Sequence, residues 1–148
     1  MFLVRPIGRA LPTAIKYLSR HPKVAVVVGR VLLEDGTSDA PALPAVLMGG
    51  ASIVRKTVLD TIGGFAAEFF RQAADYELSF RIWRAGYLIE RFEDLLFSRE
   101  HLPSGKPTEL ACRMDLRNNL ILCERYLPRP LRQEYRGDWM RPASEHVE

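Results

Sequence analysis

The feature that most constrains the fold is an uninterrupted apolar run at residues 24–28, VAVVV. Four of its residues are valine, which is β-branched, so the run favours a strand buried on both faces of a sheet. Such a strand requires helices above and below it and other strands at both of its edges. We expect few such neighbours, because few other segments of the chain have strand character.

Helix and strand patterns alternate along the chain. A predicted helix at residues 11–20 has Leu11, Ile15 and Leu18 on one face. Gly49 and Gly50 interrupt a strand pattern and indicate a bulge, or backbone that another group approaches closely. The other predicted elements are a short helix capped by Thr57 and ended by Gly63 and Gly64, a helix at 75–85, two short strands around Glu93 and Asp94, and a long helix at 109–126.

This order of elements predicts an α/β fold with layered helices on a mixed sheet. The chain has 148 residues, 47% of them apolar and 26% charged, which suits one ordinary globular domain. We place that domain at residues 1–128 and a C-terminal tail at 129–148. The net charge of +3 comes without a dense basic run, so no nucleic-acid partner is expected.

The two cysteines, Cys112 and Cys123, lie eleven positions apart on the predicted long helix. They point the same way but are too far apart along the helix axis to form a disulfide. We therefore predict buried free thiols in a reducing compartment.

No apolar run approaches the ~20 residues that a membrane-spanning helix needs, and the first residues do not resemble a signal peptide. These features favour a cytoplasmic protein, with a peripheral membrane contact left open. The basis for such a contact is the tail, whose arginines alternate with two acids that argue against it. These residues are Arg129, Arg132, Arg136 and Arg141, with Glu134 and Asp138.

Asp75 and Glu77 need an explanation, because they begin a predicted helix that is otherwise largely apolar. Tyr76, Phe80 and Trp83 form the second of its two apolar stripes, so we expect the helix to be buried on most sides. Asp75 fits two roles, a helix-start acid favoured by the helix dipole or a catalytic base. Glu77 stands four residues before Arg81, in the favourable order for an ion pair along a helix, so we interpret it as structural. The two acids could clamp one divalent metal only if the helix had not yet begun at Asp75.

No other residue pattern indicates a particular reaction or ligand. His101 directly follows a predicted strand, where ligands often sit in α/β folds, but a plain loop histidine fits as well. The sequence has no G-x-S-x-G nucleophile motif, and its GGAS segment is neither a phosphate loop nor a dinucleotide fingerprint. The residues alone therefore indicate an α/β domain with one unexplained acidic helix start.

Five segments occur in a telling order: HPKVAVVVGRVLLEDGT, MGGASIVRKTVLDTIGGFAAEFF, AADYELSFRIWRAGYLI, REH and RNNLILCERYLP. Together they resemble the C-terminal half of a family 2 glycosyltransferase, from about residue 11 to residue 127. The resemblance implies part of a GT-A fold, which is nucleotide-diphospho-sugar transferase-like. It also implies inverting transfer of a sugar from a nucleotide-sugar donor to a hydroxyl of a glycan or lipid-linked acceptor, usually with Mn²⁺ or Mg²⁺.

The resemblance assigns roles to individual residues. Asp75 matches the Asp of the family's Glu-Asp pair, so it would be the base that takes the proton of the acceptor hydroxyl. Gly49, Gly50 and Ala51 match the stretch where the backbone lies close to the sugars. His101 matches a late histidine that helps to bind the metal in some members.

Two departures from the family pattern leave alternatives open. Ala74 stands where the Glu of the Glu-Asp pair is expected, and no D-x-D metal motif occurs in the chain. Residue 1 falls about where that motif would have ended, so we expect a truncated gene, a true start further upstream, or a second chain that supplies the nucleotide-binding half. The alternatives are a non-catalytic remnant or accessory chain without that half, and an unrelated α/β binding module.

Overall fold

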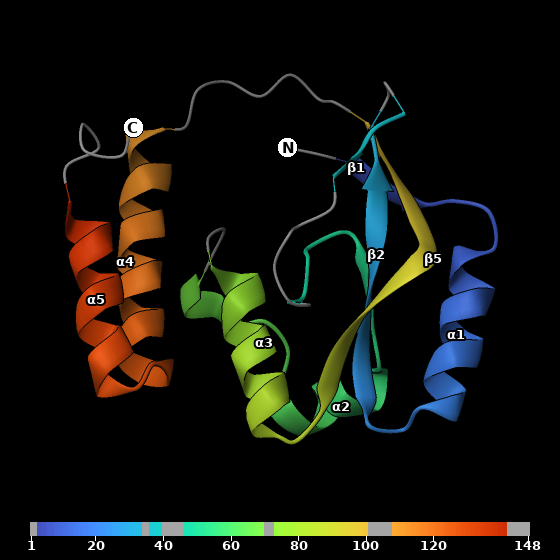
Figure 1. Cartoon of the computed structure of the whole chain (residues 1–148), viewed down its shortest axis with the longest axis horizontal. Helices are drawn as coiled ribbons and strands as arrows, with labels where there is room; N and C mark the ends of the chain where they lie inside the picture. Colours follow the sequence, from blue (N-terminus) through green and yellow to red (C-terminus); the bar gives the residue numbers. More distant parts are fainter. Residues whose placement is uncertain (1–2, 34–35, 40–45, 70–72, 101–107, 142–148) are drawn as a thin grey trace.

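The centre of the molecule is a mixed sheet around two long strands, β2 (Val24–Leu32) and β5 (Leu88–Glu100), which pair in parallel. The computed structural model describes residues 3–33, 36–39, 46–69, 73–100 and 108–141. Figure 1 shows α1 (Ala10–Arg20) on one side of these strands and α3 (Ala74–Arg84) on the other. The chain is therefore an α/β protein, as its alternating patterns predict.

Strand β2 is paired at both of its edges from within the chain. β5 lies along one edge, and β3 (Ser38–Asp39) and β4 (Ser52–Val54) pair antiparallel with the other. The remaining strand, β1 (Leu3–Pro6), pairs antiparallel with the end of β5. The expectation of few neighbours for this strand was wrong, because β5 returns from far along the chain to supply the parallel partner.

A bulge makes β5 a single strand, where the sequence predicted two strands around residues 93–94. Val28 pairs with Arg91, but Arg30, two positions later, pairs with Leu96. The extra residues on β5 are accommodated as an irregularity that bends the strand without ending it. The acidic pair therefore marks a bulge and not a turn.

Gly29 lies at this bulge, where the two strands approach too closely for any side chain. A Cβ at this position would be 2.2 Å from the Leu95 carbonyl oxygen and 2.6 Å from the ring of Phe97. Both obstacles are buried, and one of them is backbone. The pairing of β2 with β5 consequently depends on a glycine here.

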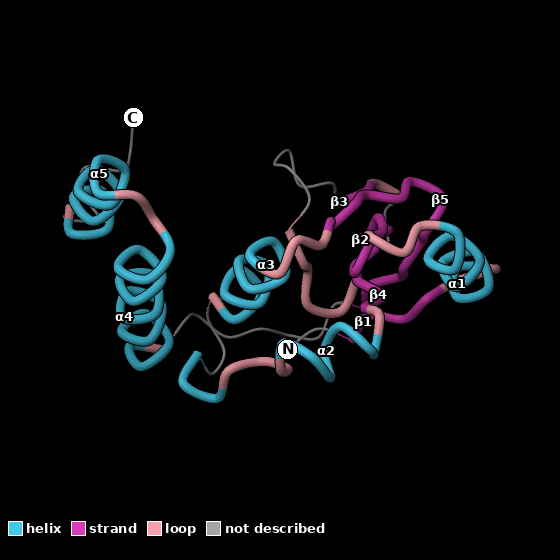
Figure 2. Tube along the Cα trace, turned by 90° about the horizontal axis from the view of Figure 1, so that it is seen from below, coloured by secondary structure: helices cyan, strands magenta, loops and turns pink. Residues whose placement is uncertain are grey.

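Helices cover both faces of the sheet, as Figure 2 shows. Val27 and Val31 of β2 belong to the apolar cluster on the α1 side. Val26 and Val28 belong to the opposite cluster, which α3 and α2 (Lys56–Ile62) complete. This burial on both faces is what the valine run predicts.

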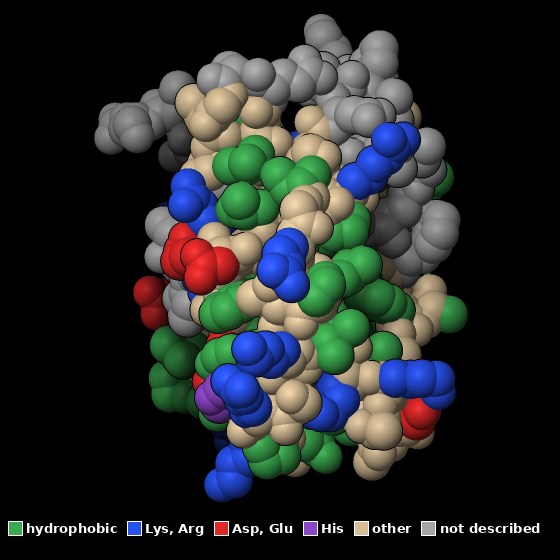
Figure 3. Space-filling view, turned by 90° about the vertical axis from the view of Figure 1, so that its right-hand side faces the viewer, with side chains coloured by type: hydrophobic (Ala, Val, Ile, Leu, Met, Phe, Trp, Pro, Cys, Tyr) green, Lys and Arg blue, Asp and Glu red, His purple; other side chains and the backbone are tan. Residues whose placement is uncertain are grey.

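Helix α1 turns its small side chains towards the sheet. Ala10, Ala14 and Leu18 are buried, whereas Leu11 and Ile15 are 49% and 65% exposed. The predicted apolar face was therefore wrong in two of its three members, because alanines let the helix lie closer to the strands. Figure 3 faces this side of the molecule and shows hydrophobic side chains among Lys and Arg side chains.

Helix α2 begins at Lys56, so Thr57 does not cap it as predicted. Arg55 holds the N-cap position, and its guanidinium donates to the carbonyl oxygens of Leu18 at 2.6 Å and Val24 at 3.1 Å. These bonds tie the start of α2 to α1 and β2. The helix ends at Ile62, and the C-cap residue Gly63 has a φ of 85°, which favours glycine, as the sequence indicates.

The C-terminal part of the described chain is a pair of helices. α4 (Glu109–Tyr126) has the predicted bounds, and Thr108 caps it by accepting a bond from the Ala111 N–H at 3.2 Å. The predicted tail contains α5 (Arg129–Met140), which packs against α4. Figure 1 shows this helix pair beside α3, on the side of α3 that faces away from the sheet.

The free cysteines differ in their surroundings, since Cys123 is buried as predicted but Cys112 is exposed.

Two arginines of the predicted tail form ion pairs with an acid of α4. Arg132 and Arg136 lie 3.1 and 3.5 Å from the Glu124 carboxylate. Within the part of the chain that the structure describes, no helix combines the length and the apolar character required to cross a membrane.

Candidate active site at the start of helix α3

The Asp75 carboxylate lies in the first turn of α3 and faces the loop before β4. Ala73, just before the helix, has a φ of 59°, a left-handed conformation that residues other than glycine adopt rarely. The Gly49 N–H donates a 2.7 Å hydrogen bond to Asp75 Oδ2. Among the described residues, Oδ1 has no hydrogen-bond partner, so this oxygen is available to accept a proton.

A second contact fixes the same loop against α3. The Leu47 N–H donates at 2.9 Å to Ser79 Oγ, and that hydroxyl donates at 2.7 Å to the backbone oxygen of Asp75. Ser79 and Leu47 are both buried. The loop is therefore held on the helix at Leu47 and at Gly49, which gives the carboxylate a defined position.

The two glycines before β4 are crowded for different reasons. A Cβ on Gly49 would lie 3.0 Å from Asp75 Oδ2, and a Cβ on Gly50 would lie 3.2 Å from a methyl carbon of Val4. Gly50 also has a φ of 94°, which disfavours a side chain. The prediction of closely approached backbone is confirmed, and the approaching groups are the Asp75 carboxylate and Val4. Ala51 lies beside them but is only 1% exposed, within the core.

Burial raises the pKa of the Asp75 carboxyl above its ordinary value, and the hydrogen bond from the Gly49 N–H opposes that shift. A raised pKa means that the carboxylate holds a proton more strongly than an exposed aspartate does. A group of this kind is a stronger general base than an ordinary carboxylate, provided that it is ionised at the working pH.

Glu77 is structural, as its spacing from Arg81 indicates. Its carboxylate accepts a 2.7 Å bond from Arg81 Nη2 and a 2.8 Å bond from the Tyr126 hydroxyl. Arg81 also donates to the carbonyl oxygens of Ile62 at 2.9 Å and Gly64 at 2.6 Å, at the end of α2. Glu77 thus joins three helices, and both of its oxygens are engaged.

The described residues do not form a metal centre. They contain no group of three or more His, Cys, Asp or Glu side chains placed to hold a metal ion. Asp75 already lies in the helix, and the Glu77 carboxylate is bound to Arg81, so the pair does not form the metal clamp considered from its spacing. His101 lies outside the described residues. Ala74, the departure from the Glu-Asp pair, is the first residue of α3.

Sequence reasoning missed the contribution of α4 and overestimated the burial of α3. Tyr126 hydrogen-bonds Glu77 and stacks on Phe80 with ring centroids 4.8 Å apart. Tyr76 and Trp83 of the predicted apolar stripe are 46% and 38% exposed. The aromatic spacing on α3 was the available signal, but only the fold shows that α4 contacts part of this stripe and leaves the rest open.

No protein-family model matches the chain, and no curated protein matches it. The geometry shows a partly buried carboxylate with one oxygen held by a backbone N–H and the other without a hydrogen-bond partner among the described residues. Burial raises the pKa of this carboxyl. Such a group can take a proton from a hydroxyl that is placed against it.

Proposed function

We propose that the chain is the acceptor-side part of an inverting, family 2-type glycosyltransferase, with a partial GT-A fold and Asp75 as its general base. The observation that carries the proposal is the position of the Asp75 carboxylate at the start of α3, 2.7 Å from the Gly49 N–H. The five segments quoted above supply the reaction class, and the fold places two of their motifs, the glycine pair and the acidic helix start, in contact.

In the proposed reaction, Asp75 Oδ1 accepts the proton of an acceptor hydroxyl while the hydroxyl oxygen bonds to the anomeric carbon of the donor sugar. The bond from that carbon to the nucleoside diphosphate breaks, and the electron pair leaves with the diphosphate. Attack and departure on opposite sides invert the anomeric centre. The Gly49 N–H holds Oδ2 throughout, which keeps Oδ1 turned towards the acceptor.

The proposal requires a nucleotide-binding half that these residues do not supply, either in the same reading frame upstream or in another chain. Mn²⁺ or Mg²⁺ would neutralise the leaving diphosphate in such an enzyme. The described residues hold no group of three or more potential metal ligands, so the residues that bind the metal would belong to that other half. Donor binding would likewise belong to the other half.

The test is a transfer assay on the complete product of the gene, read from its genomic frame, with a panel of UDP- and GDP-sugars and Mn²⁺ or Mg²⁺. Asp75→Asn keeps an oxygen for the Gly49 N–H but cannot accept the proton. We expect it to lower kcat by about 100-fold or more, with donor KM little changed. Turnover near that of the unchanged protein would refute Asp75 as the base.

The matched control is Asp60→Asn, which alters an exposed helical aspartate whose one ion-pair partner among the described residues is Lys56 on the same helix. It should leave transfer unchanged. An upstream stop codon or unrelated gene, together with no micromolar binding of UDP or GDP to this chain, would favour the remnant or accessory chain in place of a working transferase.

A further inference from the structure

A pocket of about 370 Å³ lies between α3 and the α4–α5 helix pair. This volume is within the range of small-molecule sites, which are mostly apolar with a few polar groups. The pocket is lined by Tyr76, Phe80, Leu122, Cys123, Leu127, Leu131, Glu134, Tyr135 and Asp138.

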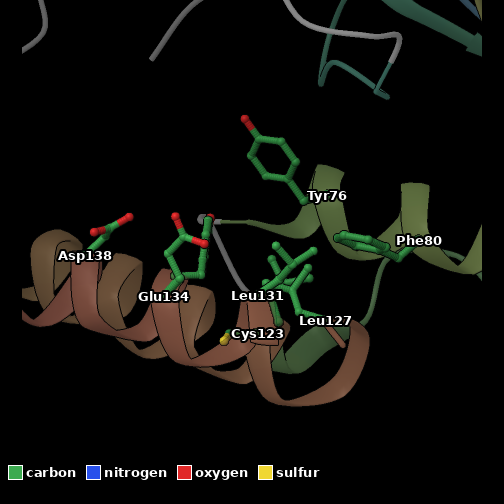
Figure 4. A pocket seen from close by; sticks show the side chains of 9 residues that line it. Tyr76, Phe80, Cys123, Leu127, Leu131, Glu134 and Asp138 are labelled. Carbon is green, nitrogen blue, oxygen red and sulfur yellow. The ribbon is translucent and has the colours of Figure 1, made fainter. Parts of the chain in front are cut away.

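The two ends of this pocket differ in chemistry. Figure 4 shows Phe80, Leu127 and Leu131 grouped at one end, with the carboxylates of Glu134 and Asp138 projecting from α5 towards the other. Aliphatic and aromatic side chains at the first end favour an apolar group that leaves water. The carboxylates at the second end can accept hydrogen bonds from hydroxyl groups.

The charged side chains that line this pocket are acidic. No Lys or Arg is among the described residues that line it. Glu134 has no ion-pair partner among the described residues, whereas Asp138 lies 3.2 Å from the exposed Arg141. An anionic head group placed here would meet an unpaired carboxylate of the same sign, which disfavours binding.

We infer that this pocket binds the aliphatic body of an uncharged, hydroxylated amphiphile such as an alkyl glycoside, with hydroxyl groups at Glu134 and Tyr76, and that it excludes phosphate-linked lipids. That this ligand is the acceptor rests on the proposed function. Tyr76 follows Asp75 directly, so the turn of α3 that lines the pocket also carries the proposed base.

Tryptophan fluorescence provides a direct measure of binding. The chain has two tryptophans, and both contact aromatic residues of the pocket. Trp83 lies edge-to-face with Phe80 at 5.5 Å between centroids, and Trp139 lies 6.4 Å from Tyr135. A ligand in the pocket should therefore change the emission of the whole chain.

The experiment titrates the chain with n-octyl β-glucoside below its critical micelle concentration, and in parallel with n-octyl phosphate and with glucose. We expect a saturable change with octyl glucoside and at least about tenfold weaker binding of the other two. No saturable change, or equal binding of octyl phosphate, would overturn the inference.

Two variants locate the binding. Leu131→Glu puts a charge into the apolar wall at a half-exposed position and should weaken octyl glucoside at least about tenfold. Leu110→Glu makes the same change at an exposed leucine of α4 outside the pocket and should bind normally. Equal losses in both variants, with unchanged circular dichroism, would place the ligand elsewhere.

Glu134→Gln tests the exclusion of anions. It removes the unpaired charge and keeps a hydrogen-bonding amide, so the preference for octyl glucoside over octyl phosphate should fall several-fold. An unchanged preference would contradict the charge argument.

The binding assay also separates this inference from the proposed function. Saturable binding without sugar transfer by the complete product would leave the pocket standing and refute the transferase. Transfer to short and alkyl-linked acceptors with equal kcat/KM would refute the pocket as the acceptor site.

Discussion

Glu77 is a buried charge whose value to the fold depends on its partners. It is 3% exposed, and its carboxylate is held by Arg81 and by the Tyr126 hydroxyl. Removal of one member of such a pair leaves the other charge buried without compensation, which costs far more than the net contribution of the pair. Arg81 would lose this counter-charge while still bound to the carbonyl oxygens at the end of α2.

We therefore expect Glu77→Ala to lower the free energy of unfolding by on the order of 3 kcal/mol. Urea unfolding followed by circular dichroism would measure it. The comparison is Asp60→Ala, which breaks an exposed pair with Lys56 and should cost no more than about 0.5 kcal/mol. Similar losses in the two variants would show that the Glu77 contacts contribute little.

The raised pKa of Asp75 leads us to predict how the free energy of unfolding depends on pH. A carboxyl whose folded pKa lies above its unfolded value contributes stability below the unfolded pKa, and this is lost as pH rises through the folded pKa. In Asp75→Asn, the new amide side chain cannot ionise, and its oxygen can still accept the Gly49 bond. The variant should therefore match the unchanged chain in urea unfolding near pH 3.5 and be more stable than it at pH 7. Equal or lower stability of the variant at pH 7 would contradict the shift.

Sequence reasoning at the residue scale succeeded where a local rule governs the side chain. The spacing of Glu77 and Arg81 on one helix predicts their ion pair. The glycine pair predicts a bulge or a close approach of another group, and the structure shows the close approach. The identity of that group could not be read from the chain, because Gly49 and Asp75 meet only through the fold. Tyr126 was missed for the same reason.

At the scale of elements, Gly29 sets the shape of the central strand pair. Gly29→Ala places a methyl group 2.2 Å from a backbone oxygen that cannot rotate away. We expect a loss of at least the roughly 1–3 kcal/mol of an overpacked core, seen as a lower melting temperature. Gly64→Ala, with no atom within 4 Å of the added methyl, is the matched control and should be nearly neutral. Equal melting temperatures of the two variants would mean that the backbone at the bulge shifts to accommodate the added methyl group at little cost.

Element bounds were predictable where their signals are local in the chain. Both bounds of α4 match the prediction, because Thr108 caps the start of the helix and Pro128 follows its end. β5 was divided wrongly, since an acidic pair resembles a turn unless the bulge opposite Gly29 is known. The apolar face of α1 was misjudged because a close approach to strands selects alanine over leucine.

At the scale of the whole molecule, the layers follow from the valine run, but the placement of α4 and α5 does not. α4 is joined to the rest by Tyr126 and by an ion pair between Arg125 and Glu68. α5 has no buried residue in the described chain and packs on α4. Of the helices that form the pocket, α5 is consequently the one held least by packing against the rest of the molecule.

Cys123 reports on this arrangement, because its thiol lies beneath α5 and donates to the Arg132 carbonyl oxygen at 3.2 Å. Burial raises the pKa of the Cys123 thiol, so little thiolate is present and the native protein should react slowly with a disulfide reagent. In a Cys112→Ser variant, which removes the exposed thiol, we expect Cys123 to become reactive at urea concentrations below the global unfolding midpoint. An element with few buried contacts opens before the core does. Labelling that follows the global transition would instead show that α5 unfolds with the sheet.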